Sequence, residues 1–167
     1  MIFSGRIVCK GVTESRVARQ LAADYRRMFG TEPTIIQGKA QKGDIVLSLK
    51  GGGALGEEGY TMTVKKQAIV TARTGKGLYW ATRTLLQLFE QSKDRALPQG
   101  FARDVPDYPF RGFMLDCGRK FFSMDMLRDY VRMMAYYKMN VFHIHLNDNA
   151  FHSFFNADWD RTPAAFR

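Results

Sequence analysis

Apolar and polar residues alternate with a period of two along two neighbouring segments, Tyr60 to Val64 and Ala68 to Ala72. Such alternation is typical of strands that have one buried face. The polar residues Lys65, Lys66 and Gln67 between the two segments predict a hairpin turn. Shorter apolar runs predict three more strands earlier in the chain, over Phe3 to Val12, Thr34 to Gln37 and Asp44 to Lys50.

Two other segments repeat apolar residues at helical spacing. The first is expected to begin behind an N-cap at Thr13 and to end at Gly30, which suits the left-handed position after a helix. The second covers Gly75 to Gln91 behind a predicted cap at Thr74. Residues 1–104 thus alternate strands and helices. This order predicts a small α/β sandwich, in which a mixed sheet carries its helices on one face.

The remaining residues, 105–167, predict a strand, a helix and a second strand. Their bounds are about Arg111 to Cys117, Met124 to Lys138 and Asn140 to Leu146. In a single sheet this order implies a parallel pair with a right-handed crossover, the repeating unit of a (β/α)8 TIM barrel. Because such a barrel usually needs about 250 residues, we expect an incomplete barrel. Its open edge is expected to cause self-association. Proline and polar residues over Leu97 to Gly100 and over Asp104 to Asp107 predict the linker between the two domains.

Two residues of opposite charge follow the two predicted barrel strands. Arg119 lies just past the end of the first strand, and Asp148 lies just past the end of the second. The loops that carry catalytic residues gather at the C-terminal ends of barrel strands. Arg119 and Asp148 are therefore the candidate site, although an ion pair between them that only joins the strands is an alternative.

Other polar residues of this region are expected to be structural. Asp116 lies inside the first strand and needs a partner, which the sequence does not identify. His143 and His145 share one face of the second strand, but the sequence offers no third metal ligand. Near the second helix of the first domain, Tyr79 and Trp80 could stack on a sugar, but their helical spacing favours a place in the core.

Composition excludes few functions. The net charge of +9 could favour nucleic acid. The basic residues are scattered over several predicted elements, however, so solvated faces are favoured and no nucleic-acid partner is expected. No apolar run is long enough to span a membrane. The two cysteines, Cys9 and Cys117, lie in apolar strand contexts and are expected to be buried free thiols.

The segments FRGFMLDCGRKFF and MMAYYKMNVFHIHLND resemble the opening of the catalytic barrel of family 20 glycoside hydrolases, the β-N-acetylhexosaminidases. The segment from Glu58 to Gln91 is similar to the non-catalytic domain that precedes this barrel. The fixed positions of the barrel motif are present from Arg111 to Asp148. Asn149 departs from the motif, because the family usually has a second aspartate there.

The resemblance implies a retaining exo-enzyme that removes terminal N-acetylglucosamine or N-acetylgalactosamine from glycans without a cofactor or metal. In such enzymes the 2-acetamido group of the substrate attacks the anomeric carbon, assisted by an Asp–Glu pair on later strands. Arg119 would bind sugar hydroxyls, and Asp148 would orient a histidine further along. Because the 167 residues contain no Asp–Glu pair, the chain alone is expected to be inactive. The resemblance also implies an exported parent protein.

Asn149 leaves a second interpretation open, in which the chain comes from a non-catalytic carbohydrate-binding relative of the same family. An Asp–Glu pair after a later strand would favour the enzyme. A basic nucleic-acid-binding module is a third interpretation, and only the net charge supports it.

Overall fold

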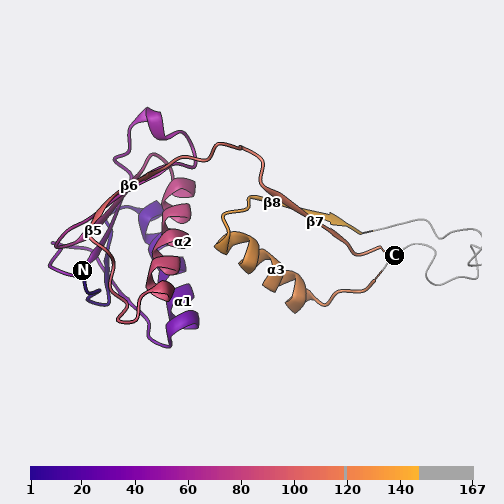
Figure 1. Cartoon of the computed structure of the whole chain (residues 1–167), viewed down its shortest axis with the longest axis horizontal. Helices are drawn as coiled ribbons and strands as arrows, with labels where there is room; N and C mark the ends of the chain where they lie inside the picture. Colours follow the sequence, from indigo (N-terminus) through magenta and orange to yellow (C-terminus); the bar gives the residue numbers. More distant parts are fainter. Residues whose placement is uncertain (119, 147–167) are drawn as a thin grey trace, which may run out of the picture. The chain divides into compact units, whose positions relative to one another are not determined.

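The computed structural model describes residues 1–118 and 120–146. The chain divides into two compact units, the first over Met1–Asp107 and the second beginning at Tyr108. Each unit has its own sheet, with six strands in the first and two in the second (Figure 1).

The first unit is a mixed sheet in the order β2-β1-β3-β5-β4-β6. Its strands are β1 (Arg6–Val8), β2 (Thr34–Ile36), β3 (Ile45–Ser48), β4 (Tyr60–Val64), β5 (Ala68–Ala72) and β6 (Gly100–Asp104). The first three and β5 run parallel, whereas β4 is antiparallel to both β5 and β6. The predicted hairpin and mixed sheet are therefore confirmed.

Strand β6 was not predicted, because its residues show no apolar alternation. It is an edge strand that pairs with β4 alone, and nearly all of its residues are exposed. The strand thus runs from Gly100, the last residue of the first predicted linker segment, to Asp104, the first residue of the second. Backbone pairing, rather than side-chain burial, holds this segment in place.

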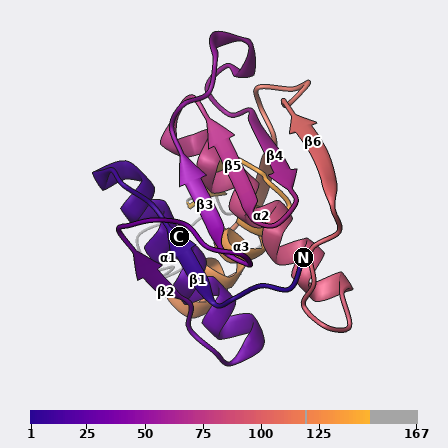
Figure 2. The same cartoon turned by 90° about the vertical axis from the view of Figure 1, so that its left-hand side faces the viewer.

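Two helices, α1 (Val12–Phe29) and α2 (Gly75–Gln91), cover one face of the sheet. Figure 2 shows the strands in front of these helices. Thr74 caps α2 as predicted, since its hydroxyl accepts hydrogen bonds from the backbone N–H groups of Lys76 and Gly77. The predicted cap at Thr13 is wrong, because the N-cap is Gly11, two residues earlier, and no side chain accepts a hydrogen bond at this end of α1.

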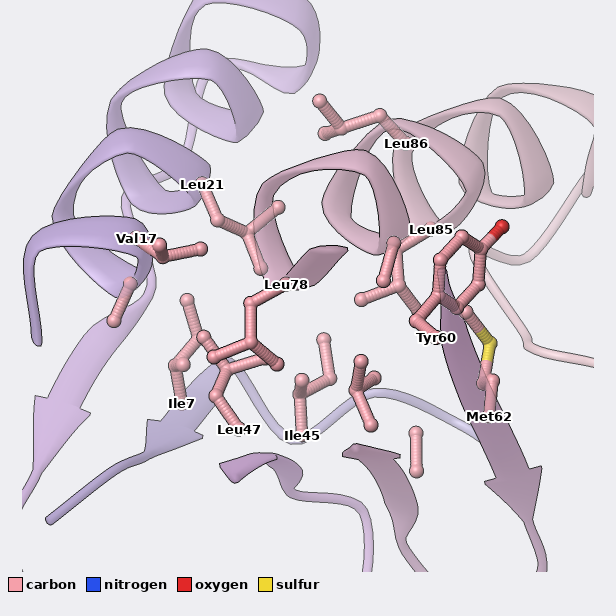
Figure 3. Packing of buried hydrophobic residues seen from close by; sticks show 14 of the residues in the cluster. Ile7, Val17, Leu21, Ile45, Leu47, Tyr60, Met62, Leu78, Leu85 and Leu86 are labelled. Carbon is pink, nitrogen blue, oxygen red and sulfur yellow. The ribbon is translucent and has the colours of Figure 1, made fainter. Parts of the chain in front are cut away.

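The core lies between the sheet and the two helices (Figure 3). Along each inner strand, every second side chain points toward the helices and is buried. For β4 and β5 the alternation of the sequence predicted this. The largest fully buried side chains of strands and helices include Ile7, Leu21, Ile45, Tyr60, Val70, Leu78, Leu85, Leu86 and Phe89. Trp80 is also buried and Tyr79 packs against the same cluster, which agrees with the core interpretation of this aromatic pair.

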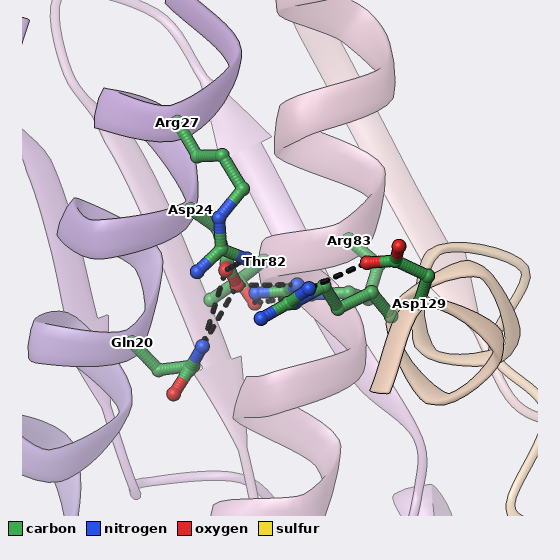
Figure 4. A network of polar contacts seen from close by, with 7 residues as sticks. Gln20, Asp24, Arg27, Thr82, Arg83 and Asp129 are labelled. Carbon is green, nitrogen blue, oxygen red and sulfur yellow. Dashed lines mark hydrogen bonds and ion pairs between the residues drawn. The ribbon is translucent and has the colours of Figure 1, made fainter. Parts of the chain in front are cut away.

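A buried ion pair joins the two helices. Arg83 of α2 donates a hydrogen bond of 2.7 Å to the carboxylate of Asp24 on α1. Gln20 and Arg27 also donate to this carboxylate (Figure 4). The guanidinium of Arg83 stacks over the ring of Tyr79, 4.4 Å from its centroid. Burial raises the pKa of the Tyr79 hydroxyl above 10.0, and the charge of Arg83 partly offsets this rise.

The start of the first unit is tied to the segment that follows α2. The backbone N–H of Leu97 donates to the carbonyl of Met1 at 2.8 Å, and Ile2 forms an isolated antiparallel bridge with Ala96. These contacts join the first residues of the unit to residues near its end, which is Asp107. They place the beginning of the chain beside the segment that leads into β6.

The second unit contains β7 (Gly112–Asp116), α3 (Met124–Tyr136) and β8 (Val141–His145). The two strands are parallel and in continuous register from Gly112↔Val141 to Asp116↔His145. The predicted strand–helix–strand unit is confirmed. No helix among residues 1–118 and 120–146 is long and apolar enough to cross a membrane.

Replacing Arg83 with methionine should lower the free energy of unfolding of the first unit by about 3 kcal/mol, because the Asp24 carboxylate would lose its shortest charged contact inside a buried site. The double variant Arg83→Met/Asp24→Leu should recover most of this loss, since no unpaired charge remains. Guanidinium denaturation followed by Trp80 fluorescence in a Trp159→Phe background measures the effect. Equal losses in the single and double variants would contradict it.

Replacing Gly77 with alanine should destabilise the first unit by about 2 kcal/mol, although alanine is the better helix former. An added Cβ would overlap the carbonyl oxygen of Gly59 and lie 2.9 Å from the Cβ of Ala72. Gly53→Ala is the control, because no atom lies within 4 Å of its added Cβ. The same denaturation assay compares the two variants, and a Gly77→Ala protein as stable as the control would refute the expected clash.

Candidate functional site

Both predicted site residues, Arg119 and Asp148, lie outside the described residues. The structure does describe the strand ends from which their loops leave, at Asp116 to Gly118 and at His145 to Leu146. The site can therefore be built up to the points where these loops begin.

The C-terminal ends of β7 and β8 bring two titratable side chains together. Because Asp116 and His145 are register partners, their side chains leave the sheet on the same face. The Asp116 Oδ1 lies 3.5 Å from the His145 Nδ1, and both side chains are partly exposed. The same carboxylate oxygen accepts a 2.9 Å hydrogen bond from the Gly118 N–H. His145 is thus the partner of Asp116 that the sequence did not identify.

The backbone continues the pairing past the end of β7. The N–H of Cys117 donates to the carbonyl of His145 at 2.8 Å, so the ladder extends to the last residue before the loop that contains Arg119. Cys117 is only partly buried, which corrects the expectation for this thiol, whereas Cys9 is buried as expected. A strand end fixed by backbone and side-chain contacts gives the following loop a defined starting direction.

The two faces of the β7–β8 pair differ in character. On the helix side, Phe113 stacks on Tyr130 of α3 and on Phe142 of β8, with ring centroids 5.4 Å and 6.1 Å apart. The opposite face carries Met114, Asp116, His143 and His145, as the period of two requires. Aromatic packing therefore fixes the helix on one side and leaves the polar groups on the other.

This polar face does not assemble a metal site among residues 1–118 and 120–146, where no three His, Cys, Asp or Glu side chains converge. The chemistry that the described groups can perform is hydrogen bonding. The Asp116 carboxylate lies beside one nitrogen of the His145 imidazole, and an imidazole can donate or accept through its second nitrogen.

The N-terminal ends of the strands are locked by a separate network. The Arg111 N–H donates to Asn140 Oδ1 at 2.9 Å, and its Nε donates to the Lys138 carbonyl at 2.7 Å. Asn140 in turn donates through Nδ2 to the Pro109 carbonyl. Lys138 has a positive φ of 57°, which ends α3 and turns the chain toward β8.

Sequence reasoning missed this role for the motif positions Arg111, Lys138 and Asn140. Their side chains and carbonyls set the register of β7 against β8 at the end of the strands opposite the candidate site. Their recurrence at fixed spacing in the motif was the available signal. The network explains why a motif associated with catalysis contains residues that lie far along the strands from the catalytic end.

Two family models match the chain in sequence order. The model described as glycosyl hydrolase family 20, domain 2, matches residues 4–105, and the model described as glycosyl hydrolase family 20, catalytic domain, matches residues 108–155. The first match covers most of the first unit. The second includes the β7–α3–β8 unit and continues past the described residues.

Relatives and solved structures agree with these matches. A β-hexosaminidase of Akkermansia muciniphila is 40% identical over 95 residues, which cover 55% of this chain and 19% of that protein. The family 20 β-N-acetylhexosaminidase of Streptomyces coelicolor has a TM-score of 0.75 at 32% identity. A mutant β-hexosaminidase of Streptomyces plicatus in complex with product (GlcNAc) has a TM-score of 0.76 at 32% identity. Each structural match covers 89% of this chain and 31% of the other.

The chain thus spans about a fifth of that curated relative and about a third of those solved structures. The match to domain 2 alone extends over more than half of the 167 residues, and the structural matches include both units. On this evidence the chain belongs to glycosyl hydrolase family 20.

Proposed function

We propose that this chain supplies the second domain and the first barrel strands of an exo-β-N-acetylhexosaminidase, with the domain boundary near residue 105. The observation that carries the proposal is the ordered match to domain 2 and then to the catalytic domain of one family. The product GlcNAc bound by the Streptomyces plicatus relative supports a terminal N-acetylhexosamine as the substrate. The partner is therefore a glycan that ends in this sugar.

Arg119 is proposed to bind the hydroxyl groups of the terminal sugar. It follows the end of β7, which Cys117 and Asp116 fix against β8. A guanidinium offers five N–H donors in a planar arrangement and keeps its charge at all working pH values, so it suits a ligand with several hydroxyl acceptors.

Asp148 is proposed to orient a histidine of the complete barrel, and that histidine would support the acid–base machinery. It follows β8 by three residues. In the proposed reaction the 2-acetamido oxygen bonds to the anomeric carbon while the glycosidic bond breaks, and a general acid protonates the leaving oxygen. Water then opens the intermediate with net retention. The Asp–Glu pair for these steps is not among the 167 residues.

A non-catalytic carbohydrate-binding protein of the same family is the second candidate. Asn149 favours it, because it stands where the family motif usually has an aspartate beside Asp148. An amide at this position cannot carry the negative charge of a carboxylate. We further propose that the parent protein is exported, as its family suggests.

Replacing Arg119 with alanine should lower kcat/KM on an aryl N-acetylglucosaminide by about 100-fold, because the sugar would lose charge-assisted hydrogen bonds worth about 3 kcal/mol in total. The assay uses the longer enzyme that the proposal implies, with this chain as part of it. Arg128→Ala is the control, since Arg128 lies exposed on α3 and pairs only locally with Asp125. Its activity should equal that of the unchanged protein.

An active parent that tolerates Arg119→Ala would assign this arginine a structural role. A silent parent without an Asp–Glu pair would make the carbohydrate-binding candidate the leading one. The 167-residue chain alone should release no aryl alcohol above the blank, and enzyme-dependent release would contradict the assignment of the catalytic pair to later strands.

Self-association of the 167-residue chain is expected from apolar side chains that the second unit leaves exposed. Met114 of β7 lies on the face opposite α3 with 55% of its surface exposed, and Phe110 and Tyr137 are also exposed. Light scattering over a concentration series should show oligomers. Met114→Asp should reduce them, whereas Val12→Asp at the exposed beginning of α1 should not. A monodisperse monomer at high concentration would count against the proposal.

A further inference from the structure

The sheet of the first unit has a second face that neither α1 nor α2 covers (Figure 2). The strand register determines which side chains lie there, because they alternate with the side chains that point toward the helices. Val8 is buried although it lies on this side of β1, whereas Ile69 and Phe101 are exposed. The strand residues of this face, defined here as the open face, are Arg6, Val8, Thr34, Ile36, Val46, Ser48, Thr61, Thr63, Ile69, Thr71, Phe101 and Arg103.

Hydroxyl groups and apolar surface lie in neighbouring rows of the open face. Register partners place Ser48, Thr71 and Thr61 in one row across three strands, next to Arg103 on β6. In the adjacent row Thr63 lies between two exposed apolar side chains, Ile69 with 42% and Phe101 with 68% of its surface accessible. Hydroxyl acceptors and donors beside flat apolar patches suit the polar edges and the C–H faces of sugar rings.

The charged strand residues of the open face are both arginines, and one of them is paired with a carboxylate. Among its strand residues, all within the described part of the chain, there is no carboxylate, and Arg6 and Arg103 are the charged groups. Asp44, which immediately precedes β3, is fully buried and forms an ion pair with Arg6. Asp104 of β6 lies on the other face, where Tyr60 donates to its carboxylate.

An open cleft of about 610 Å³ lies where this face meets the β4–β5 turn. It is lined by Thr63, Lys65, Lys66, Gln67, Ile69 and Gln99. The two lysine side chains are exposed, and the turn is held by the hydrogen bond from the Gly43 N–H to the Lys66 carbonyl. Two adjacent ammonium groups and two amides thus border the apolar surface at Ile69.

We propose that the open face is an accessory binding surface for an anionic glycan, one whose sugar rings carry sulfate or carboxylate groups. The positive charges of Lys65, Lys66 and Arg103 favour an anionic polymer. The hydroxyl and amide side chains beside them can form hydrogen bonds with the hydroxyl groups of sugars. The proposal rests on the proposed function in one respect, since that function makes a glycan the natural ligand. A single-stranded nucleic acid is less suited, because bases need several aromatic platforms and Phe101 is the one aromatic residue among the open-face strand residues.

The bound glycan would lie across β5, β4 and β6, with its acidic groups near Lys65, Lys66 and Arg103. Arg103 is held by a hydrogen bond from its guanidinium to the Ala54 carbonyl at 3.0 Å. Such a surface would retain an acidic polymer while terminal residues are removed elsewhere. A glycan bound at this surface would keep its terminal sugars at a high local concentration near the protein, as the first of two linked binding events does.

The test measures binding of chondroitin sulfate oligosaccharides to the full 167-residue chain by titration calorimetry at two salt concentrations. The variant Lys65→Glu/Lys66→Glu should lose about tenfold or more in affinity, because two exposed attractions become repulsions. Arg16→Glu/Arg19→Glu is the matched control, since it changes the net charge equally on the exposed side of α1. Thermal unfolding confirms that both variants are folded.

Phe101→Ala tests the apolar row separately and should weaken binding about threefold without changing the salt dependence. Neutral chitooligosaccharides should bind at least tenfold more weakly than the anionic probe. Absence of binding by the anionic glycan would overturn the proposal. So would equal losses in the two charge-reversal variants, or single-stranded DNA that binds as tightly with the same dependence on Lys65 and Lys66.

Failure of this proposal is distinguishable from failure of the proposed enzymatic function. A small aryl N-acetylglucosaminide has a single sugar ring and no anionic group for the lysines to bind, so its turnover by the longer protein should not change in Lys65→Glu/Lys66→Glu. Activity on the aryl substrate without anionic glycan binding would leave the enzyme assignment intact and remove the accessory surface.

Discussion

The first unit depends on one constraint, which is that all of its helices cover the same face of the sheet. Apolar side chains must then occupy every second strand position, and the positions between them remain open to solvent or to a ligand. Buried residues such as Ile7, Ile45 and Val70 lie on the same side of the sheet, because the strand register places inward-pointing residues opposite one another. The other face is mixed, since it carries two arginines and several hydroxyl groups together with exposed apolar residues such as Ile69 and Phe101.

The helices that cover this sheet are held to each other by a charged contact as well as by apolar packing. A buried pair such as Arg83–Asp24 adds little net stability compared with apolar residues, but it is costly to separate. We interpret it as a device that fixes how α1 and α2 lie side by side. The surrounding donors, Gln20 and Arg27, leave the carboxylate well satisfied.

Much of this fold could be predicted from periodicity, because burial imposes a pattern on sequence. The hairpin β4–β5, the helix behind Thr74 and the parallel β7–β8 pair all have such a pattern. Strand β6 has none, since an exposed edge strand needs only its backbone groups. The partner of Asp116 could not be predicted either, because the register of β7 against β8 decides which residue lies opposite it. That register depends on contacts of Arg111 and Asn140 at the other end of the strands.

The bridge between Ile2 and Ala96 has a consequence for the order in which the nascent chain can fold on the ribosome. Strand β1 lies inside the sheet, but the unit closes only when residues near position 97 and the strand β6 have emerged to pair with segments made much earlier. Long-range closure of this kind raises contact order and slows folding. The β7–α3–β8 unit, in contrast, closes over about thirty residues, so it can form soon after its second strand is synthesised.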